Sequence, residues 1–331
     1  MQILTRIQDT VDRHDMFERG DSVLVCVSGG SDSVFLLHAL LRLKKRLGIT
    51  LFVANMDHGI RGRASSRDSD FVRALTRELG LKFFHKKLKF EKKKKLSVEE
   101  TARYERYKFF ESVAYENNLN KIVTAHTADD LAETVLMRII KGTSLKGIIG
   151  IPPKRTSTSA MYVRPLIDVE KDEILRFLKS QKIHYVVDIT NNDNKYFRNT
   201  VRNTIIPELS RYNPRLKRSL VNLAESLRED KEFIDSAKEK ISNIIEEGRS
   251  CVSLRLKDIV IQPRAIQKEI TRDALMKAGS DIKKLNFRHW KEISALIRLK
   301  PCGKSLDLPG GIRLAKKRDM LTMERHSTTV S

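Results

Sequence analysis

The stretch Ser28-Gly29-Gly30-Ser31-Asp32-Ser33 combines hydroxyls, glycines and one carboxylate in a pattern suited to phosphate chemistry. Glycines let backbone N–H groups approach an anion, and a helix that begins at such a turn directs its dipole at the same point. A Walker A loop carries a lysine after its second glycine, whereas here three hydroxyls and Asp32 take that place. We therefore expect the loop to bind a pyrophosphate while Asp32 helps to hold the accompanying Mg²⁺. The alternative is an unliganded turn between a strand and a helix.

Two carboxylates and an imidazole form a second candidate group. Asp130 and Glu133 are three residues apart, so they share one face of a helix predicted to begin near residue 128, and His126 precedes them at the end of a predicted strand. Such a group could bind a metal, act as acid and base, or hold a cationic substrate. Asp129 and Asp130 could instead serve only to begin the helix, but this explains neither Glu133 nor His126.

Other polar candidates flank the predicted sheet. Asp57, His58 and Arg61 follow the second predicted strand, and polar residues at the C-terminal end of a parallel strand lie where open α/β sheets bind ligands. An ordinary loop is the alternative for these three. Arg103 and Arg106 are three residues apart on a predicted helix and are therefore neighbours on one face.

The elements that must position these residues alternate between short apolar strands and amphipathic helices. Residues 23–27 are an apolar run typical of a central parallel strand, and the helix after the phosphate loop is expected to end at Gly48. Further strands are predicted over 51–56, 81–88, 121–125, 161–166 and 184–187, and a loop over 141–158. This alternation predicts an α/β fold with a doubly wound, mostly parallel, Rossmann-like sheet.

The character of the sequence changes beyond about residue 212. Charged helices with one apolar stripe are predicted over 215–247, 266–278 and 288–299, followed by a hairpin over 306–323. We therefore predict two domains, a catalytic α/β domain over 1–208 and a second, mostly helical domain with a terminal hairpin over 209–331.

The charge balance indicates a polyanionic partner. The formal net charge of +22 is too large for ordinary surface solvation and is spread over both halves, which favours an extended partner such as folded RNA. A charged surface that only maintains solubility is the alternative. The lysine-rich run over 86–95 predicts a solvated loop or, alternatively, sequence-independent contacts to RNA phosphates.

Cysteine usage and hydropathy predict a cytoplasmic protein. Cys26, Cys251 and Cys302 are far apart and form no disulfide or zinc pattern, as expected in a reducing compartment. No apolar run approaches the ~20 residues of a membrane helix, and the charged N-terminal segment lacks the apolar core of a signal peptide.

Six motifs, in order along the chain from about residue 20 to 210, together resemble the tRNA(Ile)-lysidine synthetases of the PP-loop N-type ATP pyrophosphatase superfamily. The first motif alone is shared with the wider superfamily, whereas the set is specific. The motifs are SGGSDS at 28–33, MDHGIR at 56–61, ARYERY at 102–107, AHTADDLAET at 125–134, RPL at 164–166 and RNTVRNTIIPEL at 198–209. The C-terminal part resembles the family only in general character.

The resemblance implies a two-step ligation. ATP adenylates the C2 carbonyl oxygen of the wobble cytidine, at position 34 of a tRNA(Ile) with a CAU anticodon, and pyrophosphate leaves. The amine of free L-lysine then attacks C2 and expels AMP. The product, lysidine, pairs with A in place of G, so decoding changes from AUG to AUA. The 209–331 domain would bind the tRNA.

The resemblance also implies roles for the candidate residues. Asp32, Arg106 and His126 would be catalytic, with Asp32 also a ligand of Mg²⁺. Lysine would be bound by Asp130, Glu133 and Arg198. ATP would be bound by Ser28, Gly29, Gly30, Ser31, Asp32, Ser33, Met56, Asp57, His58 and Arg61.

Two other functions are alternatives. A tRNA 2-thiolation enzyme of the same superfamily would activate the same kind of carbonyl, but such enzymes usually employ catalytic or cluster-binding cysteines, which here are single and scattered. An RNA-binding module that uses ATP only structurally explains the net charge but not the group of acids and histidine. The sequence leaves the oligomeric state open, with a homodimer as one candidate.

Overall fold

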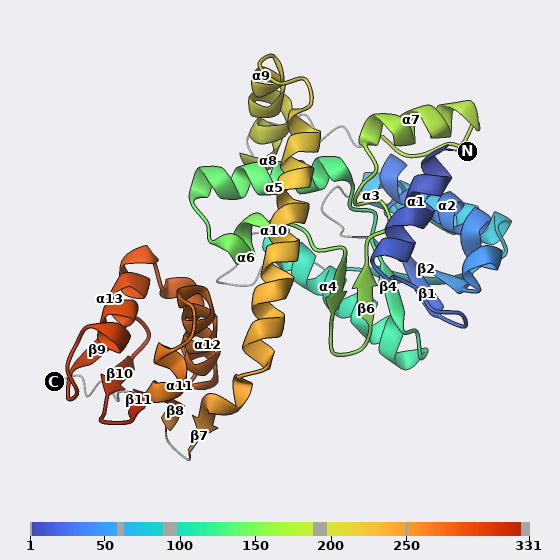
Figure 1. Ribbon diagram of the computed structural model, residues 1–331. Coiled ribbons are helices and arrows are strands. Elements are labelled where there is room, and N and C mark those ends of the chain that lie inside the picture. Colours follow the sequence, from blue (N-terminus) through green and yellow to red (C-terminus); the bar gives the residue numbers. More distant parts are fainter. Residues whose placement is uncertain (1, 58–62, 89–97, 188–196, 249–250, 326–331) are drawn as a thin grey trace. The chain divides into compact units, whose positions relative to one another are not determined.

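The computed structural model describes residues 2–57, 63–88, 98–187, 197–248 and 251–325 (Figure 1). The chain forms two compact units, Met1–Leu227 and Arg228–Ser331. The division lies within the long helix α10 (Leu216–Glu239), whereas the boundary predicted after residue 208 lies in the short helix α9 (Ile206–Ser210). No helix in the described ranges has both the length and the apolar character that crossing a membrane requires.

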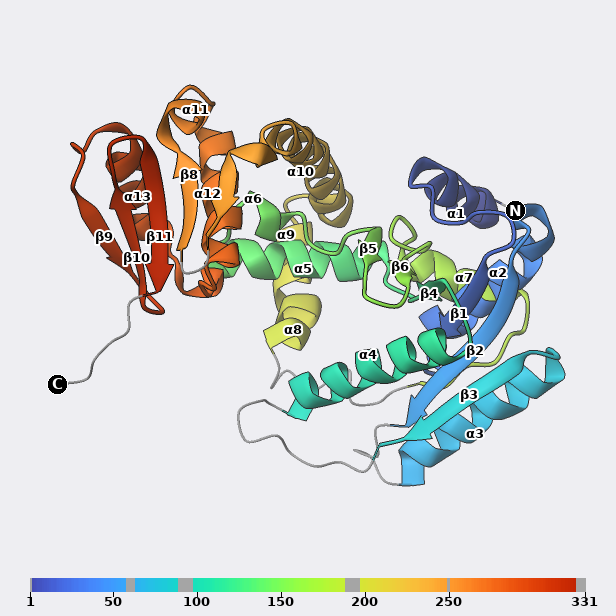
Figure 2. The ribbon, with the colours of Figure 1, turned by 90° about the horizontal axis from the view of Figure 1, so that it is seen from below.

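The first unit is built around a six-stranded sheet in the order β3-β2-β1-β4-β6-β5 (Figure 2). Its strands are β1 (Ser22–Cys26), β2 (Thr50–Asp57), β3 (Lys82–Lys87), β4 (Lys121–Val123), β5 (Lys154–Thr156) and β6 (Met161–Val163). Neighbours pair in parallel except for β5, which is antiparallel to β6. The register aligns Val25 of β1 with Val53 of β2 and Val123 of β4. The predicted doubly wound, mostly parallel sheet is therefore confirmed.

Helices cover both faces of this sheet. The covering helices are α1 (Gln2–Arg13), α2 (Ser31–Leu47), α3 (Arg63–Glu78), α4 (Val98–Glu116) and α7 (Lys171–Ser180), while α5 (Ala128–Lys141) and α6 (Leu145–Ile148) belong to a separate apolar cluster. Successive strand residues point to opposite faces. Val23 and Val25 pack in one cluster with α1, α2 and α7, whereas Leu24 packs in another with α4. Gly48 ends α2 in the left-handed conformation, as predicted.

The strand order places the two groups of candidate residues together. From β1 the chain adds β2 and β3 on one side, then returns to the other side for β4 and β6. In open α/β sheets, ligands bind at such a switch point, beyond the C-terminal ends of the strands. The phosphate loop follows β1 and His126 follows β4, so both lie at this point of the sheet.

Two segments differ from the prediction. Residues 184–187 form no strand, and the backbone N–H of Val186 instead donates a hydrogen bond of 2.9 Å to the carbonyl of Gly29 in the phosphate loop. The loop predicted over 141–158 contains α6 and β5. β5 has no apolar alternation of its own and is stabilised by its pairing with β6, which a local pattern cannot reveal.

A continuous helical run follows at residue 197 and packs on α5. It consists of α8 (Phe197–Thr200), the π-helical segment η2 (Val201–Ile205) and α9. Val201 and Ile206 share a buried cluster with Leu131 and Val135 of α5. Short π-helical segments occur frequently at functional sites, and this one lies directly beside the candidate acids of α5.

The second unit contains an antiparallel sheet in the order β7-β8-β11-β10-β9. Its elements are β7 (Ile245–Glu247), β8 (Cys251–Arg255), β9 (Ser305–Leu308), β10 (Ile312–Lys316), β11 (Met320–Arg325), α11 (Leu256–Val260), α12 (Arg264–Lys277), α13 (Phe287–Arg298) and the 3₁₀ segments η3 (Ser242–Ile244) and η4 (Ile282–Lys284). The predicted terminal hairpin is confirmed by the pairing of β9 with β10. The helix predicted over 215–247 is wrong beyond Glu239, where α10 ends and η3 and β7 follow. The sequence analysis did not predict β8, because β8 places only Val252 and Leu254 in the core.

Candidate active site

The phosphate loop is a tight turn between β1 and α2 that is held by its own serines. The Ser33 hydroxyl donates to the Gly30 carbonyl at 2.9 Å and accepts from the backbone N–H of Ser28 at 3.1 Å. Gly29 has a φ of +94°, which favours glycine. The helix α2 begins at Ser31, so its first N–H groups, which have no partner within the helix, lie at the end of this turn. The loop therefore has the geometry of an anion-binding helix N-terminus.

The carboxylate of the loop is paired with a lysine from another helix. Lys171 Nζ lies 2.9 Å from Asp32 Oδ2, and the Ser31 hydroxyl donates to Asp32 Oδ1 at 3.2 Å. Lys171 is the first residue of α7, and its backbone N–H donates to Asp129 Oδ2 at 2.7 Å. The sequence analysis missed Lys171, because it is 139 residues from Asp32 and no local pattern links the two.

The first two residues of the motif at 56–61 lie at the C-terminal end of β2. Met56 and Asp57 are the last residues of β2, and both are buried. Asp57 accepts a hydrogen bond of 3.2 Å from the Ser66 hydroxyl. Because β2 pairs with β1 in parallel, its C-terminal end lies at the same edge of the sheet as the loop. His58 and Arg61, also predicted to bind ATP, lie outside the described residues.

His126 is a neutral imidazole near pH 7. Burial lowers its pKa to about 4, the carboxylate of Asp130 opposes this shift, and the charges of three nearby arginines add to it. The Nδ1 atom of His126 lies 2.9 Å from the Thr124 hydroxyl. His126 is thus suited to hydrogen bonding and is a weak base.

The acids of α5 hold two arginines of the helical run. Arg198 Nη2 lies 2.8 Å from Asp130 Oδ1, and Arg198 Nε lies 2.9 Å from Glu133 Oε2. Arg202 Nε and Nη2 lie 2.6 and 3.0 Å from the two carboxylate oxygens of Glu133. The side chain of Glu133 is 3% exposed and that of Asp130 is 20% exposed. The structure therefore brings together Asp130, Glu133 and Arg198, the three residues predicted to bind lysine.

Asp130 has two structural tasks. Its Oδ2 accepts a hydrogen bond of 2.9 Å from the backbone N–H of Thr127, the N-cap of α5, and so closes a capping box. Its Oδ1 faces Arg198. Burial works against ionisation of Asp130, but its pKa is lowered overall by Arg198, His126, Thr127 and Arg202. Asp130 therefore does help to begin the helix, through its Oδ2 atom, while its Oδ1 atom belongs to the candidate site.

Arg202 is a site residue that the sequence analysis did not single out. Burial works against its charge, but its pKa is raised overall by hydrogen bonds to Glu133 and by the charges of Glu133, Asp130 and Asp32. The contribution of Asp32 shows that Arg202 also lies within electrostatic range of the phosphate loop. The one signal available in the sequence is the four-residue spacing of Arg198 and Arg202, which puts both on one helix face.

Basic residues from α4 and from the segment after β6 lie near His126. The charge of Arg106 partly offsets the burial that raises the pKa of the Cys26 thiol, so Arg106 lies within electrostatic range of the C-terminal end of β1. Arg103 and Arg164 are two of the three arginines that lower the pKa of His126. Arg164 is buried, and its Nη1 donates to the carbonyl of Pro152 at 2.5 Å. His126 thus lies within electrostatic range of several basic side chains as well as of Asp130.

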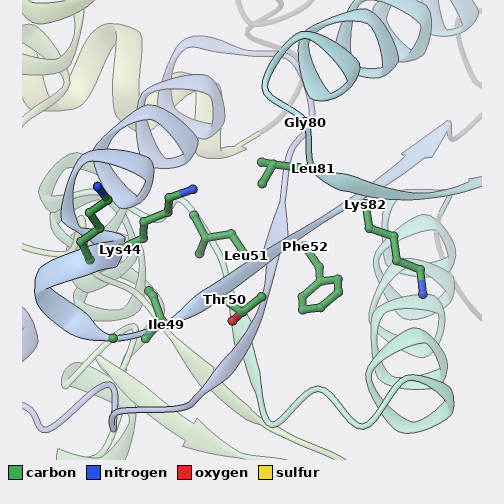
Figure 3. Close-up of a pocket in the computed structure, with 10 residues that line it drawn as sticks. Lys44, Ile49, Thr50, Leu51, Phe52, Gly80, Leu81 and Lys82 are labelled. Carbon is green, nitrogen blue, oxygen red and sulfur yellow. The ribbon is translucent and has the colours of Figure 1, made fainter.

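A separate cavity of about 550 Å³ lies at the opposite edge of the same sheet (Figure 3). It is lined by Thr50 at the start of β2, by Lys82 at the start of β3, and by Lys44 and Lys45 at the end of α2. Since these are the N-terminal ends of the strands, this cavity is not part of the candidate active site.

Relatives of known name match almost the whole chain. A family model described as a PP-loop domain matches residues 2–209. The chain is 33% identical over 329 residues to the tRNA(Ile)-lysidine synthase of Clostridioides difficile (strain 630). This match covers 97% of this chain and 70% of that protein. It is 31% identical over 331 residues to the tRNA(Ile)-lysidine synthase of Caldanaerobacter subterraneus subsp. tengcongensis, with 98% of this chain and 70% of that protein covered.

The fold also occurs in a solved structure, the U34-tRNA thiolase NcsA from Methanococcus maripaludis with its 4Fe-4S cluster. The TM-score is 0.60 at 21% identity, and the match covers 69% of this chain and 78% of that chain. At this identity the likeness shows the fold alone. From the family model and the relatives of high coverage, we conclude that the chain belongs to the tRNA(Ile)-lysidine synthase family, with its PP-loop domain over residues 2–209.

Proposed function

We propose that this protein is an ATP-dependent ligase that joins free L-lysine to C2 of the wobble cytidine in a tRNA(Ile) with a CAU anticodon. One observation carries the proposal: a phosphate loop, a neutral histidine and a group of paired acids and arginines occupy the same edge of one sheet. The loop supports the use of ATP, and the paired acids support binding of an amino acid. Membership of the family supports tRNA(Ile) as the substrate.

In the first step the base receives AMP. The C2 carbonyl oxygen attacks the α-phosphorus of ATP, the bond from that phosphorus to the bridging oxygen breaks, and pyrophosphate leaves. The backbone N–H groups at the start of α2 hold the pyrophosphate. Arg106, within electrostatic range of the end of β1, stabilises the charge of the adenylate, and His126 donates a hydrogen bond to the α-phosphate.

Asp32 fits a Mg²⁺ ion that binds together with the nucleotide. Proteins usually hold Mg²⁺ with one or two carboxylates plus phosphate oxygens and water. The side chain of Asp32 is 25% exposed and offers one such carboxylate at the loop. Within the described ranges, no group of three or more His, Cys, Asp or Glu residues could hold a metal by itself. A Mg²⁺ ion bound with the nucleotide would neutralise charge on the departing pyrophosphate.

In the second step the lysine amine, after losing a proton, attacks C2, and the bond from C2 to the adenylate oxygen breaks so that AMP leaves. We assign the contact with the lysine ammonium to Asp130, the more exposed of the two carboxylates. Glu133 is buried and engaged by both arginines, so it holds Arg198 in position. Arg198 then pairs with the carboxylate of the substrate.

The second unit is assigned to tRNA binding because it presents cations beside aromatic rings. Phe287 is 72% exposed, with Lys291 Nζ 5.0 Å from the centre of its ring. Lys268 Nζ lies 5.5 Å from the ring centre of the partly buried Trp290, while Arg272 on the same ring is buried and paired with Glu269. Stacking aromatics among basic side chains is typical of surfaces that bind unpaired nucleotides. Assembly as a homodimer stays a prediction.

The decisive experiment is incubation of the chain with ATP, labelled lysine and transcripts of either tRNA(Ile) or tRNA(Met), both with the CAU anticodon. We expect lysine to be attached to the wobble cytidine of tRNA(Ile), with AMP and pyrophosphate as the other products and little labelling of tRNA(Met). ADP as the nucleotide product, or a nucleoside that carries sulfur in place of lysine, would contradict the proposal.

A further inference from the structure

The phosphate loop lacks a cation of its own. Asp32 is the one charged residue within 28–33, and it is an acid. A pyrophosphate that is bound beside a carboxylate is repelled by it, and in the Walker A loop a lysine supplies the opposite charge. A loop that binds a polyanion therefore needs a cation from elsewhere in the fold.

Lys171 brings an ammonium group to this position from α7. Its Nζ lies 2.9 Å from Asp32 Oδ2, and the lysine side chain is 40% exposed. A lysine ammonium is a compact charge on a flexible four-carbon stem, so rotation of that stem can move it from the carboxylate to a bound phosphate without any backbone movement.

The backbone of Lys171 is anchored while its ammonium is exposed. The N–H of Lys171 donates to Asp129 Oδ2 at 2.7 Å, and Asp129 Oδ1 accepts from Lys217 Nζ at 2.5 Å. The side chain of Asp129 is 12% exposed. These contacts fix the start of α7 against the start of α5, so the reach of the Lys171 side chain to the loop is built into the fold.

Arg202 is a less suitable candidate for the same role. The charge of Asp32 also acts on Arg202, but Arg202 Nε and Nη2 are both hydrogen-bonded to Glu133. If Arg202 moved away, the buried carboxylate of Glu133 would lose one of its two arginine partners, which is costly for a buried charge. Lys171 can move at a smaller cost, because its partner Asp32 is itself partly exposed and can turn to a metal ion.

We propose that Lys171 is the pyrophosphate-binding cation of this site, supplied by α7 in place of the lysine of a Walker A loop. In the ligand-free protein it is paired with Asp32. When the nucleotide binds, Lys171 turns to the pyrophosphate moiety, and Asp32 would then be available to hold the accompanying metal ion. This inference rests on the proposed use of ATP and adds a residue that touches the leaving group.

The first test measures binding of ATP, AMP and inorganic pyrophosphate to the full chain by calorimetry. Lys171→Met should weaken ATP and pyrophosphate by about 10-fold to 100-fold, the range for a lost charge-assisted hydrogen bond, and leave AMP unchanged. Lys171→Arg should restore most of the affinity. Lys179→Met, which removes an exposed lysine at the other end of the same helix, is the matched control and should bind all three ligands like the parent.

A second test separates contact with the phosphate from neutralisation of Asp32. It compares pyrophosphate binding without metal in Asp32→Asn and in the double variant Asp32→Asn/Lys171→Met. If Lys171 touches pyrophosphate, its loss should weaken binding in both backgrounds. An equal affinity of the single and double variants would overturn the inference, because Lys171 would then act only by neutralising Asp32.

Binding measurements distinguish a failure of the proposed function from a failure of the role proposed for Lys171. A parent chain that binds no ATP would overturn the proposed function and this inference with it. A parent chain that binds ATP, together with a folded Lys171→Met variant that binds ATP and pyrophosphate as tightly, would overturn the inference alone. Thermal unfolding of each variant shows which of them are folded.

Discussion

Arg202 and Glu133 form a two-point ion pair, with Nε 2.6 Å from Oε1 and Nη2 3.0 Å from Oε2. The Glu133 side chain is 3% exposed, so its charge depends on these partners for compensation. The pair joins α5 to the π-helical segment η2 and leaves Arg198 free to bridge to Asp130 as well. The helix that carries the candidate acids and the run that carries the arginines therefore form one electrostatic unit.

Loss of the Glu133 carboxylate should destabilise the first unit. In Glu133→Ala the two arginines lose a common partner, and breaking a buried pair of this kind costs about 3 kcal/mol of unfolding free energy. Glu133→Gln should cost less, since its amide oxygen still accepts one hydrogen bond. Urea unfolding followed by circular dichroism measures both variants. An unchanged midpoint for Glu133→Ala would contradict the structural role of the pair.

Asp130→Asn should separate lysine usage from adenylation. Loss of its negative charge removes the proposed partner of the lysine ammonium, so KM for lysine should rise by about 10-fold to 100-fold. Exchange of labelled pyrophosphate into ATP, which requires tRNA but not lysine, should persist. Glu116→Gln, at the exposed end of α4, serves as the control and should leave both measurements unchanged. Normal lysine usage in Asp130→Asn would rule out the assignment.

His126 should make the stability of the first unit depend on pH. Its pKa in the folded chain is about 4, below the ordinary value of 6.5, so the unfolded chain binds a proton more readily. Stability from this group is complete above pH 6.5 and is lost as the pH falls towards 4, by at most about 3 kcal/mol.

Replacement of the imidazole tests this pH dependence directly. His126→Gln should flatten the loss of unfolding free energy between pH 6.5 and 4, since it removes the group that titrates there. His184→Gln replaces an exposed histidine and should retain the slope of the parent. Equal slopes for all three proteins would show that His126 is not the group responsible.

Gly29→Ala should impair the phosphate loop through its backbone conformation. A Cβ at this position would meet Val72 Cγ2 at 3.4 Å, an ordinary contact, so the cost of about 1–2 kcal/mol comes from the φ of +94°. Relief of that strain would turn the N–H groups of the loop away from the phosphate, so ATP affinity should fall together with stability.

Gly80→Ala is the matched control for that substitution. Gly80 also has a positive φ, +65°, and a Cβ there would meet nothing within 4 Å, but the residue lies before β3 at the far edge of the sheet. Gly80→Ala should therefore lose stability and keep its ATP affinity. A parallel loss of ATP affinity in both variants would indicate a general effect of destabilisation.

Local chemistry in the sequence was sufficient for the five parallel strands of the sheet and for the phosphate loop, but not for β5 or for residues 184–187, which form no strand. Apolar runs identify the parallel strands, and helical periodicity identifies the helices between them. The two glycines of the phosphate loop mark a tight turn, and Gly29 there has a positive φ that glycine favours. Gly48 likewise predicts the end of α2. These features depend on residues that are neighbours in the chain, so the sequence alone is enough to predict them.

The tertiary structure decided which groups meet and what charge they carry. Lys171 and Asp32 are 139 residues apart, and Arg202 and Glu133 are 69 apart, so only the packing of α7 and η2 against the sheet and α5 pairs them. The three-residue strand β5 forms because β6 offers it hydrogen bonds. The low pKa of His126 arises from burial. Each of these outcomes depends on the surroundings of a group in space, which the order of residues along the chain does not contain.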